Sequence, residues 1–291
     1  MVNLKVATAL GVVLAVAATL VGCTSQSATE SGSSTLQEVL KRGTLIVGTG
    51  STNPPWHFKD ANGQLEGMDI AMGRILAKAL FDDPNKVKFV QQSPDARIPN
   101  LITKKVDISI QFMTISPERL QQVAFSVPYY TEGTGLLLPH NGAYKSYDEL
   151  VATQESGKKI KIAILQNVYA GAIVQQMLPG AEDMQFQDVG LIYQALDSGR
   201  ADAGAVDDSS VRWLSSQNPD KYIDSKYSTY PQNYGAAMRP GDQQWINFVN
   251  GVFIDAMTGA TYPDYNAAFE KYFGEKLPAP RIGMPRMFSN E

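Results

Sequence analysis

Residues 105–110 of this chain read KVDISI, and residues 200–205 read RADAGA. Each stretch closes an expected helix with a basic residue and then opens an expected strand of small or apolar residues. A single short match can arise by chance, but it is also the trace that two similar α/β lobes would leave in one sequence. Because ligands of open α/β sheets bind beyond the carboxyl ends of the strands, a binding site is expected directly after Ile110 and Val206.

The sequence around these two stretches alternates short apolar runs with segments of helical spacing. The expected elements are strands at 45–47, 87–90, 106–110, 160–165, 184–189 and 201–206, and helices at 68–80, 97–104, 169–177, 191–198 and 245–256. Repeated strand–helix alternation predicts α/β layers built on mostly parallel sheets.

The composition is that of an ordinary globular chain: of its 291 residues, 44% are hydrophobic and 19% are charged. The formal net charge of −4 argues against a protein that binds nucleic acid, which needs a basic face. The single cysteine excludes an internal disulfide framework and a cysteine-rich zinc site. Because the two histidines, His57 and His140, lie far apart in the sequence, we expect no metal cluster, and no cofactor is predicted.

The first residues are typical of an export signal. A basic start, an apolar stretch over residues 6–21 and small residues before a cleavage site indicate a secretory signal peptide, although an uncleaved membrane anchor has similar ingredients. Leu-Val-Gly-Cys at residues 20–23 resembles the bacterial lipobox, in which the cysteine is lipidated and becomes the mature N-terminus. We therefore expect a signal peptide over 1–22, a lipid on Cys23, a flexible tether over 23–35 and a location outside the cytoplasmic membrane, in the periplasm or on the outer cell surface.

The segment after the first of the two strands, residues 111–120, reads QFMTISPERL. Ser116 as N-cap, followed by proline and glutamate, gives a well-formed helix start. Arg119 then lies in the first turn, where the positive end of the helix dipole disfavours a cation. It is either an ordinary surface arginine or, together with nearby backbone N–H groups, the receptor of an anion such as a carboxylate. Thr114 is positioned to add a hydroxyl contact.

The segment after the second strand, residues 207–211, reads DDSSV. Asp207 and Asp208 either cap the following helix or hold an ammonium group at the mouth of a cleft. An arginine in one lobe and an aspartate in the other suit a zwitterion that lies between them. This is the chemistry of an α-amino acid.

Other candidate residues lie near the same expected cleft. Trp56 follows the first strand, and Tyr169 opens the helix after Leu165; each either covers the apolar part of a ligand or packs in the core. Arg97 opens a helix and repeats the unfavourable cation placement of Arg119.

These residues resemble the extracellular solute-binding proteins of polar amino acid ABC importers, which have the type II periplasmic-binding fold. The likeness covers nearly all of residues 36–289, and the tail from 277 onward resembles the glutamate/aspartate-binding branch. Its most specific parts are RIP at 97–99, KVD at 105–107, MTISPER at 113–119 and FSVPYY at 125–130, with GQLEGMDI at 63–70 resembling the turn into the family's first helix.

The resemblance implies roles for single residues. The family's carboxylate-binding arginine falls on Arg119, and its hydroxyl ligand falls on Thr114. Its amine-binding aspartate falls on Asp208 or, by a register slip, on Asp207. In the acidic-amino-acid branch a second arginine contacts the ligand, and it falls on Arg97.

Three departures from the family pattern bear on the ligand's side chain. Phe112 stands where many members carry Gly or Ser, so an aromatic ring, next to Met113, is expected beside the ligand. QNVY at 166–169 replaces a Gly/Thr-rich loop, and residues 48–53 hold no counterpart of the acidic branch's additional arginine. A neutral polar or aromatic amino acid therefore fits the aromatic candidates at least as well as glutamate does.

The resemblance implies two lobes with a hinge and a ligand cleft between them. The chain is expected to cross between the lobes near 132–138 and 234–238, so that lobe 1 holds 36–134 and 237–291 and lobe 2 holds 135–236. Binding then proceeds by hinge closure around the ligand. The closed form, a monomer held by its lipid anchor, docks on an ABC permease in the membrane.

This function requires no chemistry on the ligand, so the chain is not expected to be an enzyme. The same fold hosts a periplasmic cyclohexadienyl dehydratase, in which a carboxylic acid assists the loss of water and carbon dioxide. Glu132, Asp207 or Asp208 would be the corresponding acid here, and the sequence offers no distinctive acid beyond the binding set.

Overall fold

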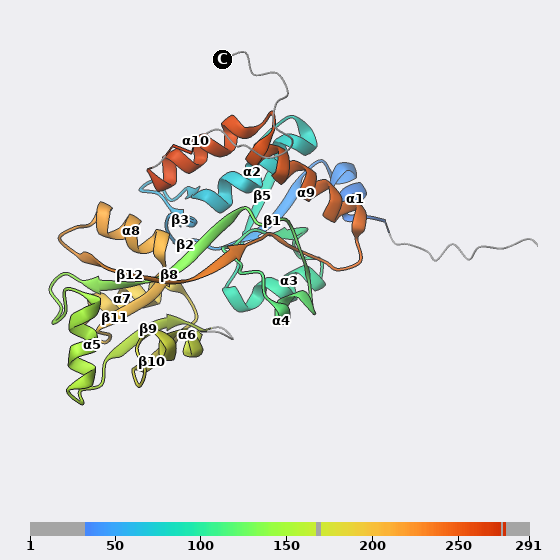
Figure 1. Ribbon diagram of the computed structural model, residues 1–291. Coiled ribbons are helices and arrows are strands. Elements are labelled where there is room, and N and C mark those ends of the chain that lie inside the picture. The colour runs from blue at the N-terminus through green and yellow to red at the C-terminus, as the bar shows by residue number, and fades with distance from the viewer. Residues whose placement is uncertain (1–32, 167–169, 275, 278–291) are drawn as a thin grey trace, which may run out of the picture. The chain divides into compact units, whose positions relative to one another are not determined.

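The computed structural model describes residues 33–166, 170–274 and 276–277 (Figure 1). Two five-stranded sheets, each with its own helices, form the two lobes of this part of the chain. No helix within these ranges combines the length and the apolar character of a membrane span.

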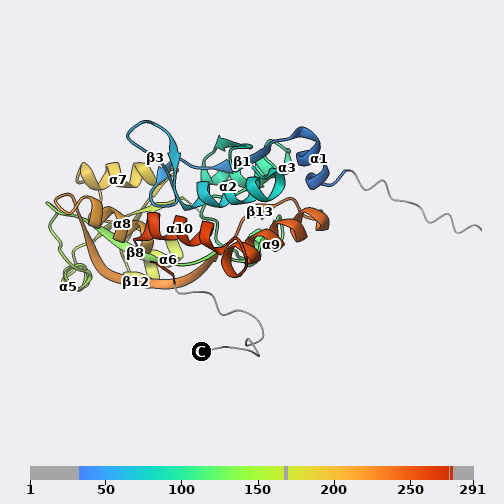
Figure 2. The same ribbon diagram turned by 90° about the horizontal axis from the view of Figure 1, so that it is seen from above.

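The first lobe is built on the sheet with strand order β5-β1-β6-β13-β7. Its strands are β1 (Leu45–Thr49), β5 (Val87–Gln91), β6 (Ile108–Ser109), β7 (Ala124–Phe125) and β13 (Ala237–Met238). Strand β1 pairs in parallel with β5 and β6, whereas β13 runs antiparallel to both β6 and β7. Its helices are α1 (Thr35–Arg42), α2 (Met68–Phe81), α3 (Arg97–Ile102), α4 (Pro117–Leu120), α9 (Gln243–Thr258) and α10 (Tyr262–Phe273), and α2, α9 and α10 pack against one another (Figure 2).

The second lobe is built on the sheet with strand order β10-β9-β11-β8-β12. Its strands are β8 (Tyr130–Pro139), β9 (Lys161–Leu165), β10 (Glu182–Phe186), β11 (Ala203–Asp207) and β12 (Tyr222–Tyr234). Strand β9 pairs in parallel with β10 and β11, and β8 runs antiparallel to β11 and β12. Its helices are α5 (Tyr147–Glu155), α6 (Ala170–Met177), α7 (Val189–Asp197) and α8 (Asp208–Gln217).

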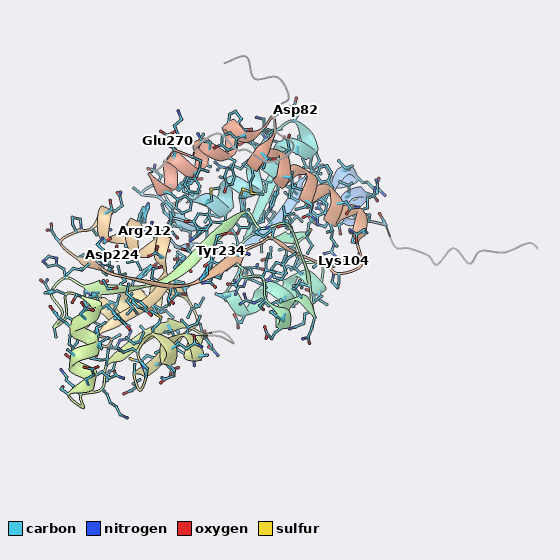
Figure 3. All side chains as sticks on the ribbon, in the orientation of Figure 1. Asp82, Lys104, Arg212, Asp224, Tyr234 and Glu270 are labelled. Atoms are coloured by element: carbon cyan, nitrogen blue, oxygen red, sulfur yellow. The ribbon has the colours of Figure 1, made fainter. Side chains whose placement is uncertain are left out.

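Two long strands carry the chain from one lobe to the other and back. Strands β8 and β12 lie side by side from the Tyr222–Pro139 pair at one end to the Tyr234–Tyr130 pair at the other (Figure 1). The chain enters the second lobe through β8, shortly after β7, and returns through β12 to β13 in the first sheet. Tyr234 therefore lies at the crossing, between the side chains of the two lobes (Figure 3).

A small sheet belongs to the first lobe and reaches toward the second. It has the order β2-β3-β4, with β2 (Thr52–Asn53), β3 (His57–Lys59) and β4 (Leu65–Glu66). Helix α2 packs against β3 and β4, whereas β2 also contacts α7 of the second lobe. A short 3-10 helix, η1 (Pro94–Ala96), precedes α3.

The expected elements form, but some of their bounds differ. Helix α2 follows the expected apolar spacing, and Met68, Met72 and Leu76 are fully buried. The expected strand over 184–189 and helix over 191–198 were wrong at their boundary. The carboxylate of Asp188 accepts a hydrogen bond of 2.7 Å from the Gly190 N–H, which caps α7 and starts the helix earlier.

Candidate functional site

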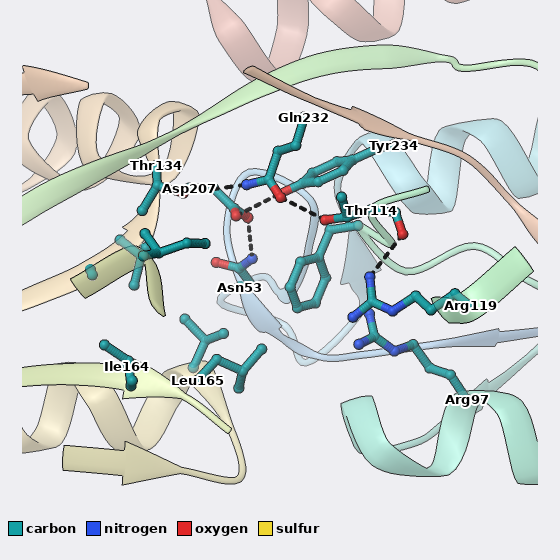
Figure 4. Close-up of a pocket in the computed structure, with 15 residues that line it drawn as sticks. Asn53, Arg97, Thr114, Arg119, Thr134, Ile164, Leu165, Asp207, Gln232 and Tyr234 are labelled. Atoms are coloured by element: carbon teal, nitrogen blue, oxygen red, sulfur yellow. Dashed lines mark hydrogen bonds between the residues drawn. The ribbon is translucent and has the colours of Figure 1, made fainter. Parts of the chain in front are cut away.

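A pocket lies between the two lobes, beside the crossing strands (Figure 4). The first lobe contributes Asn53, Arg97, Phe112, Thr114 and Arg119. The second lobe contributes Thr134, Ile164, Leu165, Ile173, Val189, Ala205, Val206 and Asp207, and the returning strand β12 adds Gln232 and Tyr234. The pocket therefore has charged groups at its ends and an aliphatic wall from the second lobe.

Two guanidinium groups lie side by side in the pocket (Figure 4). Arg119 comes from α4, and its Nη1 donates to the Thr114 carbonyl at 2.8 Å. Arg97 comes from the start of α3 and is only 4% exposed. Its Nε donates to the Pro94 carbonyl at 2.7 Å, and its Nη1 donates to the Gln111 carbonyl at 3.1 Å. Both arginines proposed from the sequence thus line one pocket.

The surroundings of Arg97 lower the pKa of its guanidinium. Burial, and next the positive charge of Arg119, lower the pKa of Arg97 to about 9. Arg97 therefore remains cationic at neutral pH. Its guanidinium carbon lies 5.4 Å from the centre of the Phe112 ring, a distance suited to a cation–π contact.

Asp207 supplies the negative charge of the pocket. Its Oδ1 accepts a hydrogen bond of 2.6 Å from the Tyr234 hydroxyl, and its Oδ2 accepts one of 3.0 Å from the Asn53 amide. Burial raises the pKa of Asp207 to about 6. At neutral pH most of the carboxyl is therefore ionised, and it lies on a different side of the pocket from the guanidinium groups (Figure 4).

Asp208, to which the sequence analysis gave the ammonium first, does not line this pocket. It is the first residue of α8, and its carboxylate pairs with Arg212 one turn further along the helix. Both of these side chains line a separate surface cavity of the second lobe. Because the chain turns from strand to helix between Asp207 and Asp208, their side chains point to different places. Asp207 is the aspartate that reaches the pocket.

Thr114 joins a chain of hydrogen bonds that runs between the lobes. Its hydroxyl donates to the Gln232 Oε1 at 2.6 Å, and the Gln232 Nε2 donates to the Thr134 hydroxyl at 3.3 Å. A hydroxyl has a single proton. In this arrangement the Thr114 hydroxyl keeps only its lone pairs for further hydrogen bonds, so it can accept but not donate.

Phe112 lines the pocket in an unusual backbone conformation. Its φ of 36° lies in the left-handed region, which side chains other than glycine rarely adopt. Its N–H donates to the buried Asp69 carboxylate at 3.0 Å. The same carboxylate accepts the Tyr129 hydroxyl at 2.8 Å and pairs with the ring of His57, which lies 4.9 Å from the Phe112 ring. This buried network holds the aromatic ring at the pocket wall.

Two other residues that the sequence offered as ligand contacts pack in the hydrophobic core. Trp56 is fully buried, and its rings pack edge-on against Tyr130 and Tyr234, while its N–H donates to the Ser209 hydroxyl at 2.9 Å. Met113 is 1% exposed and packs in the core of the first lobe, although it also lines a second cavity that shares the two arginines. Tyr169 and Cys23 lie outside the described residues.

Glu132, the acid considered for a dehydratase, lies on β8. It is 4% exposed, and its carboxyl accepts the Gly133 N–H at 2.9 Å and the Ser209 N–H at 3.3 Å, with the Ser209 hydroxyl as a third partner. Burial, and next the charge of Asp207, raise the pKa of Glu132 to about 8. It is not among the residues that line the pocket.

Sequence reasoning missed Asn53, Gln232, Tyr234 and the aliphatic wall. The aliphatic wall could have been predicted, because Leu165 and Val206 lie at the carboxyl ends of β9 and β11, where ligands of such sheets bind. Gln232 and Tyr234 gave no comparable signal, since only the tertiary fold brings them to residues far away in the sequence. No group of three or more His, Cys, Asp or Glu side chains suited to a metal ion occurs within the described ranges.

Three comparisons with known proteins agree on what the chain is similar to. A family model described as bacterial extracellular solute-binding proteins, family 3, matches residues 45–275. The glutamine-binding protein of Geobacillus stearothermophilus is 28% identical over 75% of this chain and 86% of that protein. The L-cystine-binding protein of Escherichia coli (strain K12) is 30% identical over 82% of this chain and 86% of that protein.

Solved structures agree with these matches. The crystal structure of an ancestral amino acid-binding protein, a precursor of cyclohexadienyl dehydratase, is similar with a TM-score of 0.70 and 34% identity, over 82% of this chain and 100% of that chain. The predicted two-lobed α/β fold is thereby confirmed.

Proposed function

The chain belongs to the bacterial extracellular solute-binding proteins, family 3, and from this premise we propose that its pocket binds an α-amino acid outside the cytoplasm and delivers it to an ABC permease. One observation carries the proposal: Arg119 of the first lobe and Asp207 of the second lobe line the same pocket. The relatives named for glutamine and L-cystine support an amino acid as the ligand class.

We assign the α-carboxylate to Arg119. A guanidinium is planar and presents its donors in a fork that matches two carboxylate oxygens. The hydrogen bond from Arg119 to the Thr114 carbonyl holds this fork in place. Arg97 lies beside it and adds a second positive charge that attracts the carboxylate.

We assign the ammonium to Asp207 and Thr114. Asp207 is held by Asn53 and Tyr234, and its remaining lone pairs can accept hydrogen bonds from the ligand. The Thr114 hydroxyl already donates its hydrogen bond to Gln232, so it offers lone pairs as well. Asp207 thus replaces Asp208 as the proposed ammonium partner.

We propose a neutral side chain for the ligand. Arg97 already meets two backbone carbonyls and the ring of Phe112, so its charge does not require an anion from the ligand side chain. The wall of the second lobe is aliphatic, with members such as Ile164 and Val189. An apolar wall disfavours a charged group because the group would lose its hydration without gaining a partner.

The ligand would close the lobes by bridging them. A ligand shifts an equilibrium between open and closed states only by its differential affinity for the two. A zwitterion that touches Arg119 and Asp207 at once makes both contacts only when the lobes are together. Closure then gives the permease a surface that differs from that of the open protein.

A thermal-shift screen of the twenty amino acids, followed by calorimetry on the hits, tests the proposal. We expect stabilisation by one or a few neutral amino acids and loss of binding in Arg119→Ala. Arg119→Ala should leave the free energy of unfolding within about 1 kcal/mol, and Arg74→Ala, an exposed arginine on α2, is the matched control. Retained affinity in Arg119→Ala would remove the carboxylate assignment.

A second candidate is a dehydratase, favoured by the similarity to a precursor of cyclohexadienyl dehydratase. The buried Glu132 is the acid closest to the requirement, because burial keeps it protonated, but it does not line the pocket. Incubation with prephenate or arogenate separates the candidates. We expect no aromatic product, and product formation that is lost in Glu132→Gln would establish the enzyme instead.

We also propose that Cys23 carries a lipid anchor. The support is the Leu-Val-Gly-Cys motif at residues 20–23 and the Ser/Thr/Gly-rich segment that follows it. Mass spectrometry of the mature N-terminus is expected to find an acylated cysteine. An unmodified thiol, or cleavage elsewhere, would contradict the anchor.

A further inference from the structure

The short strand β2 of the first lobe contacts the second lobe at a place separate from the crossing strands. We propose that Asn53 of this strand acts as a clasp: its side chain stabilises the closed arrangement of the two lobes even without ligand, and it completes the ammonium site as they close. The part that concerns ligand affinity rests on the proposed function, whereas the closing effect does not.

Asn53 is 1% exposed, and the three hydrogen-bond partners of its side chain belong to the second lobe. Its Nδ2 donates to Asp207 Oδ2 at 3.0 Å (Figure 4). Its Oδ1 accepts the Tyr193 hydroxyl of α7 at 3.1 Å and the Ser210 hydroxyl of α8 at 3.0 Å. One side chain of the first lobe is thus held by three elements of the second.

The two ends of the amide match their partners. An amide oxygen accepts and an amide nitrogen donates. Here the oxygen faces two hydroxyl donors, and the nitrogen faces a carboxylate acceptor. Opening of the lobes would separate Asn53 from Asp207, Tyr193 and Ser210, so these hydrogen bonds are specific to the closed arrangement.

Neighbouring residues extend the contact. The Thr52 hydroxyl donates to Asp188 Oδ2 at 3.0 Å, and Asp188 is the N-cap of α7. On the next strand, the Phe58 ring lies 5.4 Å from the ring of Trp213 on α8. The first lobe therefore meets α7 and α8 directly, through side chains of β2 and β3.

The clasp also bears on the proposed ammonium site. Tyr234 and Asn53 each hold one oxygen of Asp207, but only Asn53 comes from the opposite lobe. In the open form Asp207 would lack this donor. The carboxylate would then have greater rotational freedom, and the ammonium would meet a less organised partner.

The double variant Tyr193→Phe/Ser210→Ala tests the proposal. Neither residue lines the pocket, so the substitutions remove two clasp hydrogen bonds without removing a pocket wall. Dyes on Lys41→Cys of α1 and Glu155→Cys of α5, both exposed positions, report the distance between the lobes in a Cys23→Ser background. Without ligand, we expect the closed fraction to fall in the double variant.

The matched control is Tyr147→Phe/Ser198→Ala. It also removes one tyrosine and one serine hydroxyl, but these donate to Met177 and Gln194 carbonyls within the second lobe. We expect its closed fraction to equal that of the unsubstituted protein. Thr52→Val is a second, milder variant, which should lower the closed fraction in the same direction.

Ligand affinity gives an independent measurement. If the clasp acts by closure, the double variant weakens every amino acid that binds by the same factor, because the competent state is less populated. An unchanged closed fraction in both the double variant and Thr52→Val would overturn the clasp. A loss confined to some ligands, with the closed fraction unchanged, would make Asn53 a ligand contact instead. Opening without ligand is measured even if no amino acid binds, so failure of the proposed function remains distinguishable.

Discussion

Arg97 and Arg119 share one pocket but have different surroundings. Arg97 is almost fully buried and donates to two backbone carbonyls, whereas Arg119 is half-buried and donates to the carbonyl of Thr114. A buried guanidinium whose N–H groups are bonded to backbone carbonyls stabilises the wall of the pocket more than it binds a ligand. These surroundings favour Arg119 as the proposed partner of the carboxylate, with Arg97 beside it.

The pKa of Asp207 predicts how binding depends on pH. An ammonium needs an ionised partner, and burial raises the pKa of Asp207 to about 6. Affinity should change little between neutral pH and about pH 8, and it should weaken by about tenfold for each pH unit well below 6. Calorimetry across this range checks the prediction.

The two neighbouring aspartates provide the control for this measurement. Asp207→Asn should weaken binding severely and remove the pH dependence, whereas Asp208→Asn, which loses the pair with Arg212, should bind as the unsubstituted protein does. Constant affinity down to about pH 4 in the unsubstituted protein would contradict the assignment of the ammonium to Asp207.

Glu132 predicts a pH dependence of stability. In the folded protein its carboxyl holds a proton up to about pH 8, because of burial and the nearby charge of Asp207, whereas its ordinary pKa is 4.5. Between these two values the folded state binds more protons than the unfolded chain. The free energy of unfolding should therefore fall as the pH rises from 4.5 to about 8.

Urea unfolding at several pH values measures this dependence. Glu132→Gln keeps a neutral group of similar size in place and should reduce the slope of stability against pH, leaving the smaller contribution of Asp207. An equal slope in the variant would show that Glu132 is ionised in the folded protein.

The charged residues of the pocket were predictable in part. Arg97 and Arg119 stood out because a cation in the first turn of a helix has no local reason to be there. The choice between Asp207 and Asp208 depended on a strand–helix boundary, and a shift of one residue at such a boundary changes the direction of a side chain. Asn53 could not be found in this way, since its partners lie far along the sequence and meet it only after folding.

Asp242 joins the starts of two helices, α1 and α9. Its carboxylate caps α9 by accepting the Trp245 N–H at 3.1 Å. It also accepts the Ser34 hydroxyl at 2.7 Å and the Thr35 N–H at 2.6 Å at the start of α1. Asp242 thus satisfies donors of both helices with one side chain.

Asp242→Ala should lower the free energy of unfolding by about 1 to 2 kcal/mol, the usual effect of losing a helix cap. Chemical denaturation measures the change. Asp220→Ala, an exposed aspartate in the turn after α8, is the matched control and should have a smaller effect. A stability loss no greater than that of the control would contradict the capping role. Ligand affinity should be unchanged in both variants, because neither residue lines the pocket.

The alternation of strands and helices was predictable, since it depends on local apolar spacing. Strand β13 was not, because Ala237–Met238 is too short to stand out in a sequence and becomes a strand only by pairing with β6 and β7. The same is true of β2, whose two residues, Thr52–Asn53, pair with β3. Pairing with another strand forms both elements: β13 pairs with strands far away in the sequence, and β2 pairs across a short turn with β3.

A ligand that bridges the two lobes should stabilise the entire folded protein by mass action. At a hundredfold excess of ligand over its dissociation constant, the gain is about 2.7 kcal/mol. Thermal unfolding with and without the best amino acid of the screen measures it. Asp207→Asn, with the same ligand at the same concentration, should show little of this gain; an equal gain in that variant would place the ligand elsewhere.

The order of strands in the first sheet has a consequence for how the protein is made. Among the strands that the structure describes, β7 attaches to its sheet only through β13, which is synthesised after the second lobe. A nascent chain that ends before residue 237 therefore cannot complete its first lobe. We therefore expect the first sheet to be completed only late in translation, after the second lobe has been synthesised.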